Sequence, residues 1–215
     1  MATPPSSREK ILEVAEALFA QRGFAAVGMR EVAGAAGLGK SSLFHHFRSK
    51  AQLYYEVLGR VLSRIQGRLD APLRTAADPM ERLQGWVDAL IDALAEHPTS
   101  ARLLLRGLFE DHDLAKAPPE AEQAERVLAR ILQQIHRLLR EGVEAGTFRP
   151  VSVPDTVQTL IGATVYHFAS GEIGEGLLGG TLFSADAVRR RKRELRVLLH
   201  DGLAAAVATP TRRNP

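Results

Sequence analysis

The stretch that most constrains the fold is MREVAGAAGLGKSSLFHHFRSK, residues 29–50. Its first part places apolar side chains at positions 29, 32, 33 and 36, the spacing of a helix with one buried face. Gly37 follows, where a left-handed residue can end a helix because glycine has no Cβ atom. A second helix is expected over residues 40–47, with Leu43 and Phe47 facing inward. Two helices joined by a glycine-containing turn predict a helix-turn-helix, whose second helix enters the major groove of DNA.

An alternative interpretation of the same residues is a phosphate-binding P-loop. Residues 34–41 satisfy the pattern G-x-x-x-x-G-K-[ST], in which Lys40 would contact nucleotide phosphates and Ser41 would hold Mg²⁺. A P-loop follows a buried β-strand, whereas residues 28–33 contain two charges and have a helical period. No apolar strand ending in a metal-binding aspartate follows downstream. The local pattern therefore favours a helix-turn-helix over a nucleotide-binding enzyme.

Composition narrows the class of protein. The chain has 215 residues, of which 45% are hydrophobic and 25% are charged, as in an ordinary globular protein. It has no cysteine, which excludes disulfides, thiolate metal sites and a thiol nucleophile. The N-terminal residues lack the apolar core of a signal peptide, and no apolar run is long enough to span a bilayer. We expect a cytoplasmic protein without a membrane segment.

The small positive charge of the chain is unevenly placed. Lysine and arginine exceed aspartate and glutamate by three, and this whole excess lies within residues 1–50. Positive charge in this segment is the sign that contact with DNA phosphates requires.

Several motifs in residues 6–62 carry a family resemblance. They are Gly23-Phe24, Val32-Ala33, Ala36-Gly37-Leu38, Leu43-Phe44-His45-His46-Phe47 and Ser49-Lys50. This order resembles the N-terminal domain of TetR-family transcriptional regulators. The resemblance implies an all-α protein of about nine helices, without catalytic residues, cofactor or metal. It implies a three-helix DNA-binding domain over residues 1–50, a linking helix over about 49–69, and a ligand-binding and dimerisation domain over residues 51–215.

The candidate DNA contacts lie on the outer side of the second helix and next to it. We assign base reading to Lys40, Ser41, Ser42 and Phe44, the last against a thymine methyl group. We assign phosphate contacts to Arg30, His45, His46 and Lys50. Of the two adjacent histidines, His45 is the better candidate, because one of such a pair usually points toward the core. Three positions depart from the family pattern: Gly28 and Gly39 replace hydroxyl caps, and Phe44 replaces a common tyrosine.

The rest of the chain predicts further helices with wide apolar stripes. Helices are expected over residues 79–96, 98–112, 119–145, 154–168 and 186–207, and the glycine-rich residues 171–180 are expected to form a flexible connection. Aromatic or polar residues that interrupt the stripes are candidates for an effector pocket, or else ordinary core residues; they are Trp86, Phe109, Tyr166 and His167. The cluster at residues 110–113 lacks a second histidine at ligand spacing, so a charged helix end explains it better than a metal site.

Together these features predict a dimeric DNA-binding regulator. The last two long helices are expected to form the dimer interface, since Gly162 and Ala163 allow close approach. Two recognition helices would then enter successive major grooves, about 34–36 Å apart, of a palindromic operator. A small, largely apolar effector that prefers another spacing of the DNA-binding heads would release the repressor.

Overall fold

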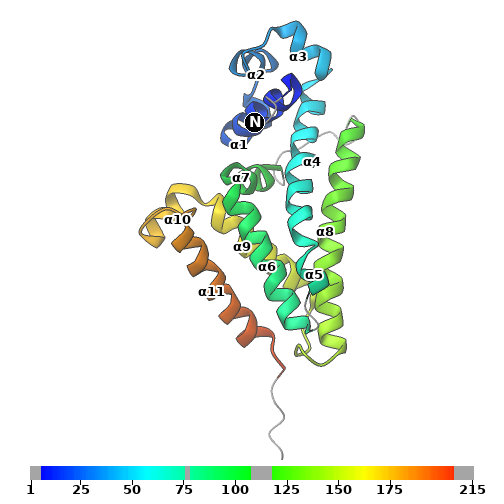
Figure 1. Ribbon diagram of the computed structural model, residues 1–215, viewed down its shortest axis with the longest axis vertical. Coiled ribbons are helices and arrows are strands. Elements are labelled where there is room, and N and C mark those ends of the chain that lie inside the picture. Colours follow the sequence, from blue (N-terminus) through cyan, green and yellow to red (C-terminus); the bar gives the residue numbers. More distant parts are fainter. Residues whose placement is uncertain (1–5, 76–77, 108–117, 206–215) are drawn as a thin grey trace, which may run out of the picture.

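The computed structural model describes residues 6–75, 78–107 and 118–205 of the chain. Its regular elements are α1 (Ser7–Ala26), α2 (Met29–Ala35), α3 (Lys40–His46), α4 (Lys50–Leu69), α5 (Pro72–Thr75), α6 (Pro79–Glu96), α7 (Pro98–Gly107), α8 (Pro119–Glu144), α9 (Val153–Ala169), α10 (Gly171–Leu178) and α11 (Ala185–Leu203). The all-α fold is thereby confirmed. The helices α1 to α3 lie at one end of an elongated molecule, and α4 runs from them into the remaining helices alongside α8 (Figure 1).

The first helix, α1, begins at a capping box formed by Ser6 and Glu9. The hydroxyl of Ser6 accepts from the Glu9 backbone N–H at 3.2 Å, while the Glu9 carboxylate accepts from the Ser6 N–H at 2.8 Å. This reciprocal capping box satisfies two N–H groups that have no partner within the helix. Helical conformation is interrupted at Gly23, which has φ 79°, so the regular part of α1 ends at this glycine.

The turn between α2 and α3 has the geometry that Gly37 was expected to allow. Gly37 has φ 69°, and the Leu38 N–H donates to the Ala33 carbonyl at 2.9 Å. The Gly37 N–H donates to the Gly34 carbonyl at 3.0 Å, which completes a Schellman motif at the end of α2. Since Gly34 itself lies inside a helix, no β-strand leads into residues 34–41. The P-loop interpretation is therefore wrong, because its phosphate-binding loop must follow a strand.

The core extends through both predicted domains. One side of α4 is buried, with Leu53, Val57, Val61, Ile65 and Leu69 at most 3% exposed. It packs against α1, α6 and most extensively against α8. One cluster of buried apolar side chains reaches from α1 to α11. The division of the chain at residue 50 thus stays a prediction, since α4 belongs to the packing of both parts.

Two connections differ from the sequence-based expectation. The stretch between α4 and α6 contains the short helix α5, and residues 171–180, predicted to be a flexible connection, mostly form α10. Gly174 explains the second difference: a Cβ atom there would clash with the Ser170 hydroxyl and lie 3.3 Å from Leu182 Cδ1. This glycine permits close packing rather than flexibility.

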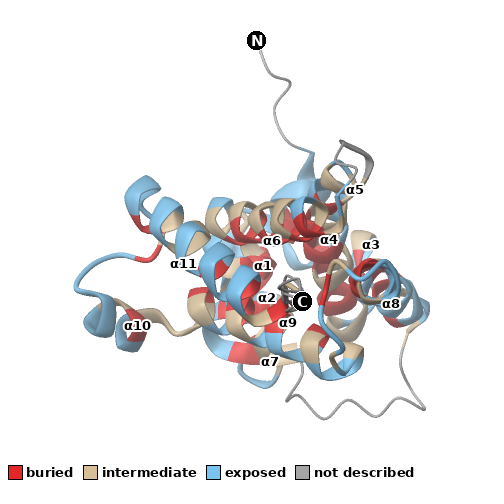
Figure 2. Cartoon of the chain, turned by 90° about the horizontal axis from the view of Figure 1, so that it is seen from below, coloured by how far each residue is buried: buried red, intermediate tan, exposed pale blue. Residues whose placement is uncertain are grey.

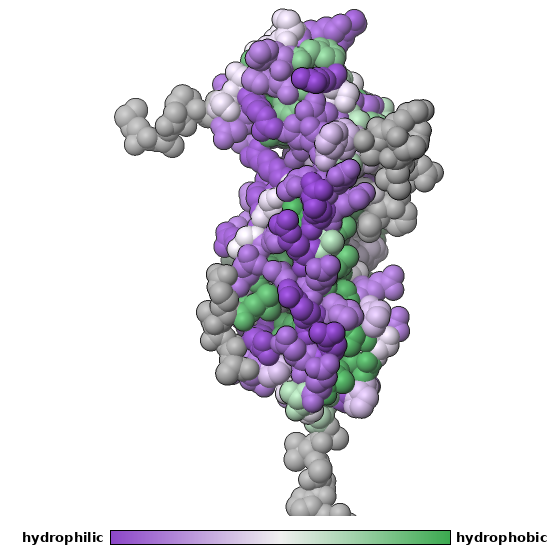
Figure 3. Space-filling view, turned by 90° about the vertical axis from the view of Figure 1, so that its right-hand side faces the viewer, coloured by the Kyte–Doolittle hydropathy of each residue, from purple (hydrophilic) through white to green (hydrophobic). Residues whose placement is uncertain are grey.

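The surface differs from one side of the molecule to another. Viewed from below, α10 and α11 lie at one side with much of their length exposed (Figure 2). The side over α8 is mainly hydrophilic, with apolar groups between the charged ones (Figure 3). None of the helices in the described ranges is long and apolar enough to cross a membrane.

Candidate nucleic-acid interface

The second helix of the motif, α3, is anchored by its inner side. Leu43 and the following Phe47 are both 0% exposed, as the sequence predicts. Of the candidate residues on the outer side, Lys40, Ser41, Phe44 and His45 are exposed, while Ser42 and His46 are partly exposed. Two buried anchors one turn apart fix the rotation of this short helix. Its amino-terminal residues are thereby presented to solvent, at the end of the molecule farthest from α8's carboxyl end (Figure 1).

Free positive charge gathers around α3. Arg30 at the start of α2 and Arg48 after α3 are exposed, and neither forms a hydrogen bond or ion pair through its side chain within the described part of the chain. Lys40 places its Nζ atom 5.6 Å from the centre of the Phe44 ring. The acidic side chain of α2, Glu31, is paired with Arg22. Arg48 is not among the DNA-contact residues predicted from the sequence, although it lies in the turn that follows α3.

Lys50 forms contacts with α1 that the sequence did not predict. Its ammonium donates to the carbonyls of Phe24 at 2.9 Å and Ala25 at 3.3 Å, and lies 4.4 Å from the centre of the Phe24 ring. These carbonyls lie at the carboxyl end of α1, where helix carbonyls lack the regular partners of the helix interior, and the Phe24 carbonyl also accepts from the Val27 N–H at 3.4 Å. Lys50 is partly buried and ties α4 to the end of α1, so the proposed phosphate contact must compete with these bonds.

We therefore expect Lys50→Met to lower the free energy of unfolding by about 1–2 kcal/mol, because it removes a charged donor from two carbonyls. Arg48→Met is the matched control: its side chain is exposed and unbonded, so the change should stay within about 0.5 kcal/mol. Urea denaturation of both variants, followed by circular dichroism, measures the difference. Equal stability of the two variants would show that the Lys50 bonds contribute nothing to folding.

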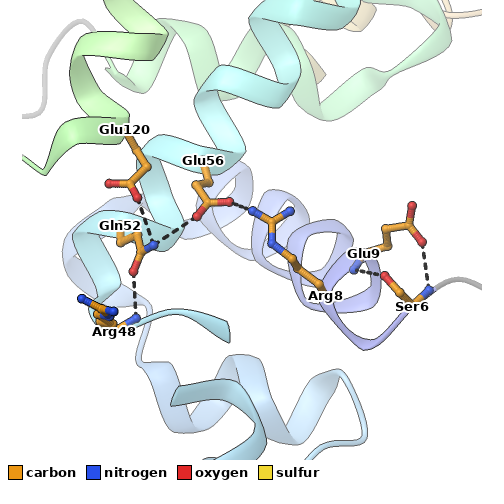
Figure 4. Close-up of polar contacts among 7 residues, drawn as sticks. All are labelled: Ser6, Arg8, Glu9, Arg48, Gln52, Glu56 and Glu120. Carbon is orange, nitrogen blue, oxygen red and sulfur yellow. Dashed lines mark hydrogen bonds and ion pairs between the residues drawn. The ribbon is translucent and has the colours of Figure 1, made fainter. Parts of the chain in front are cut away.

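A polar network joins the exit of α3 to the start of α8 (Figure 4). The Gln52 side chain donates to Glu120 at 3.0 Å and to Glu56 at 3.2 Å, while its oxygen accepts from the Arg48 backbone N–H at 2.8 Å. Ser49 caps α4, with the Gln52 N–H donating to its hydroxyl at 3.1 Å. The Gln52 side-chain oxygen accepts from the Arg48 N–H rather than from the Ser49 N–H, so no reciprocal capping box forms here.

The negative charges of Glu56 and Glu120 in this network are partly compensated by one arginine. Glu56 is ion-paired with Arg8 of α1. Burial raises the pKa of the Glu56 carboxyl, the Arg8 charge opposes this rise, and the Glu120 charge adds to it. A cavity of about 410 Å³ opens beside the pair, lined by residues of α1, α4 and α8.

A second link joins α7 to α1. Glu16, only 5% exposed, accepts from Arg64 of α4 at 2.6 Å and from the Thr99 hydroxyl at 2.8 Å. Arg106 of α7 donates to the carbonyls of Ala20 and Gln21, both at 3.1 Å. The helix-turn-helix end is thus bonded to the rest of the molecule through α7 and through α8.

The pocket candidates that the structure describes differ in their exposure. Trp86 is 0% exposed in the apolar core, whereas Tyr166 is 60% exposed on the outside of α9, so its assignment to an interior pocket is wrong for the single chain. His167 is partly buried; its pKa is lowered to about 4, first by burial and then by the charges of Arg191 and Arg190. Phe109 lies outside the described residues, as does the charged cluster at 110–113. Of the described candidates, Trp86, Tyr166 and His167, none lines the cavity beside Glu56.

Comparisons with known proteins agree with this architecture. Residues 11–57 match the family model described as "Bacterial regulatory proteins, tetR family", and residues 79–197 match "Tetracyclin repressor-like, C-terminal domain". The chain is 35% identical over 166 residues to the HTH-type transcriptional repressor KstR2 of Mycolicibacterium smegmatis, covering 76% of this chain and 78% of that protein. It is 27% identical over 187 residues to the repressor SCO4008 of Streptomyces coelicolor, covering 86% and 91%.

A solved structure shows the same fold. The ketosteroid transcriptional regulator KstR2 of Mycobacterium tuberculosis superposes with a TM-score of 0.75 and 27% sequence identity, covering 94% of this chain and 97% of that one. The family models match both the helix-turn-helix and the helices that follow it. The chain therefore belongs to the TetR family of bacterial transcriptional regulators.

Proposed function

We propose that the protein is a repressor that binds a palindromic operator as a homodimer and is released by a small, largely apolar effector. The observation that carries the DNA-binding role is α3, which is held by Leu43 and Phe47 and exposes Lys40 and Ser41 amid free positive charge. The repressor role is supported by the similar proteins, which are named repressors. We infer a binding role rather than a catalytic one, carried out in the cytoplasm where the operator DNA lies.

The proposed dimer would form through α9 and α11. Tyr166 of α9 is 60% exposed, and Val197 and Leu198 of α11 are 57% and 64% exposed. Gly162 lies one turn before Tyr166 on the same exposed side, where an added Cβ atom would meet nothing within 4 Å. Exposed apolar groups beside a small residue support a helix–helix contact between subunits.

The effector would bind near Trp86. The indole Nε1 of this buried residue has no hydrogen-bond partner within the described part of the chain. A buried donor without a partner costs about 1–3 kcal/mol, and a hydroxyl or carbonyl oxygen on an apolar effector would satisfy it. The similarity to a regulator named for ketosteroids supports an effector of this chemistry.

Release from DNA would follow from the two links between the DNA-binding end and the other helices. An effector that shifts α7 or α8 would act through Arg106 and Glu16, or through Glu120 and Gln52. Only an effector with different affinities for the two arrangements can change operator binding, and DNA must then weaken effector binding by the same factor.

Selection of DNA from a random pool tests the operator proposal. We expect enrichment of a palindrome with half-site centres separated by one helical turn, about 10–10.5 base pairs, or a multiple of it. Since Trp86 is the only tryptophan, its fluorescence reports directly on effectors that bind beside it. Titration with apolar compounds that carry a hydroxyl or carbonyl group should change this fluorescence and release the selected DNA. Selection that enriches no sequence would contradict the repressor function.

A further inference from the structure

The short helix α10 has an exposed face on which none of the described residues packs. It contacts chiefly α9 and stands out from the body of the molecule in two views (Figures 1 and 2). Ile173 is 78% exposed and Leu177 is 85% exposed, one turn apart on the same side. Glu172 and Gly176 lie on this side as well, both exposed, and an added Cβ atom on Gly176 would meet nothing within 4 Å. The face therefore combines two large apolar groups, one acidic group and one small residue.

This face is held in a defined position. Gly174, on the opposite side of α10, packs closely on Ser170 and Leu182. The helix is capped by Gly179, which has φ 72°, and by the Gly180 N–H, which donates to the Glu175 carbonyl at 3.0 Å. Ile173 and Leu177 are thus presented to solvent by a packed and capped helix, and large apolar groups presented in this way mark contact surfaces.

The outward face of α11 carries groups that complement those on the exposed face of α10. Residues 189–193 of α11 are all basic. Three of them have partners: Arg189 is paired with Asp186, and Lys192 with Asp92. Arg191 donates to the Ala163 carbonyl at 2.9 Å. The remaining two members, Arg190 and Arg193, are exposed and form no ion pair within the described residues.

One turn after Arg193 the same face becomes apolar. Val197 is 57% exposed and Leu198 is 64% exposed. Residues 190, 193 and 197 recur at helical spacing, so two free positive charges and an apolar patch form one continuous stripe along α11. On each helix the charged group precedes the apolar groups along the chain. The charge is negative on α10 and positive on α11.

We propose that α10 of one subunit docks on the outward face of α11 of a second copy of this chain. Glu172 would face Arg190 and Arg193, while Ile173 and Leu177 would cover Val197 and Leu198. The contact is reciprocal, so two copies bury two such pairs and close a symmetric dimer. The proposal rests on the proposed homodimer and adds α10 of the partner to the groups that cover Val197 and Leu198. Its charge pattern selects a second copy over other exposed helices.

The absence of cysteine from the chain allows a direct test by cross-linking. Leu177→Cys is mixed with a mass-tagged Val197→Cys protein, subunits are allowed to exchange, and a short bismaleimide is added. We expect a mixed cross-linked dimer on a denaturing gel. The matched control pairs Leu177→Cys with Leu132→Cys, on an exposed position of α8, and should give no mixed product. Equal yields in the two mixtures, or cross-linking of Leu177→Cys only to itself, would overturn the docking.

Sedimentation of the unmodified chain separates this inference from the proposed function. A dimer without the mixed cross-link rejects the docking of α10 and leaves the homodimer intact, whereas a monomer rejects both. Charge exchange gives a second test: Glu172→Arg and Arg193→Glu should each weaken dimerisation by about two- to five-fold, as expected for exposed ion pairs. The double variant should recover affinity, and independent, additive effects would contradict a direct contact.

Discussion

Lys40→Ala should weaken operator binding by about 1–3 kcal/mol, roughly a factor of 5 to 150, and should relax the preference for one base pair in each half-site. The effect follows from the position of Lys40, which is exposed at the first residue of α3. Within the described residues its ammonium group contacts the Phe44 ring and forms no ion pair. A side chain at this end of a recognition helix meets base edges rather than the phosphate backbone alone.

Fluorescence anisotropy on the operator and its single-base variants, at several salt concentrations, measures both effects. Arg130→Ala is the control, because this exposed cation lies on α8, remote from α3. It should change neither affinity nor base preference. Unchanged binding by Lys40→Ala across the salt series would show that the amino-terminal end of α3 does not meet the DNA.

Leu43→Ala should lower the free energy of unfolding by about 2–5 kcal/mol, because it removes the one buried side chain within α3 and leaves a cavity. Phe44→Ala changes a larger side chain on the same helix, yet Phe44 is 39% exposed, so we expect a loss within about 0.5 kcal/mol. Urea denaturation at unchanged m-value gives the comparison. Similar losses for the two variants would mean that α3 is not anchored through Leu43.

Comparison of Leu43→Ala with Phe44→Ala also separates an effect on folding from an effect on DNA binding. Phe44→Ala should retain the fold and still bind DNA less tightly if the ring contacts a thymine methyl group. Loss of DNA binding by Leu43→Ala would by contrast follow from loss of the helix.

The parts that the sequence predicts well are those governed by neighbouring residues. Ser6 with Glu9, Gly37 with Leu38, and Pro79 each act within one or two turns, so their effects can be derived from spacing alone. The inward side of α3 follows from helical periodicity in the same way. The family resemblance then adds the order of the elements.

The parts that the sequence does not predict depend on distant partners. Lys50 bonds carbonyls 25 and 26 residues before it, and Gln52 reaches Glu120, 68 residues later. Local spacing carries no signal for such contacts. The glycines of residues 171–180 suggested flexibility, but Gly174 is needed for close packing of α10, which only the folded chain reveals. Tyr166 shows the same limit, because its helical position does not say whether the side of α9 on which it lies faces the core or solvent.

The most direct measurement of the central claim, that the amino-terminal end of α3 lies in the major groove, is DNA cleavage from a tethered reagent. The chain lacks cysteine, so an iron chelate can be attached to Ser41→Cys alone. We predict cleavage of the operator at two places whose centres lie about 10–10.5 base pairs apart, or a multiple of this spacing. Cleavage from a chelate on Leu132→Cys of α8, with none from Ser41→Cys, would contradict the account, because another face of the protein would then meet the DNA.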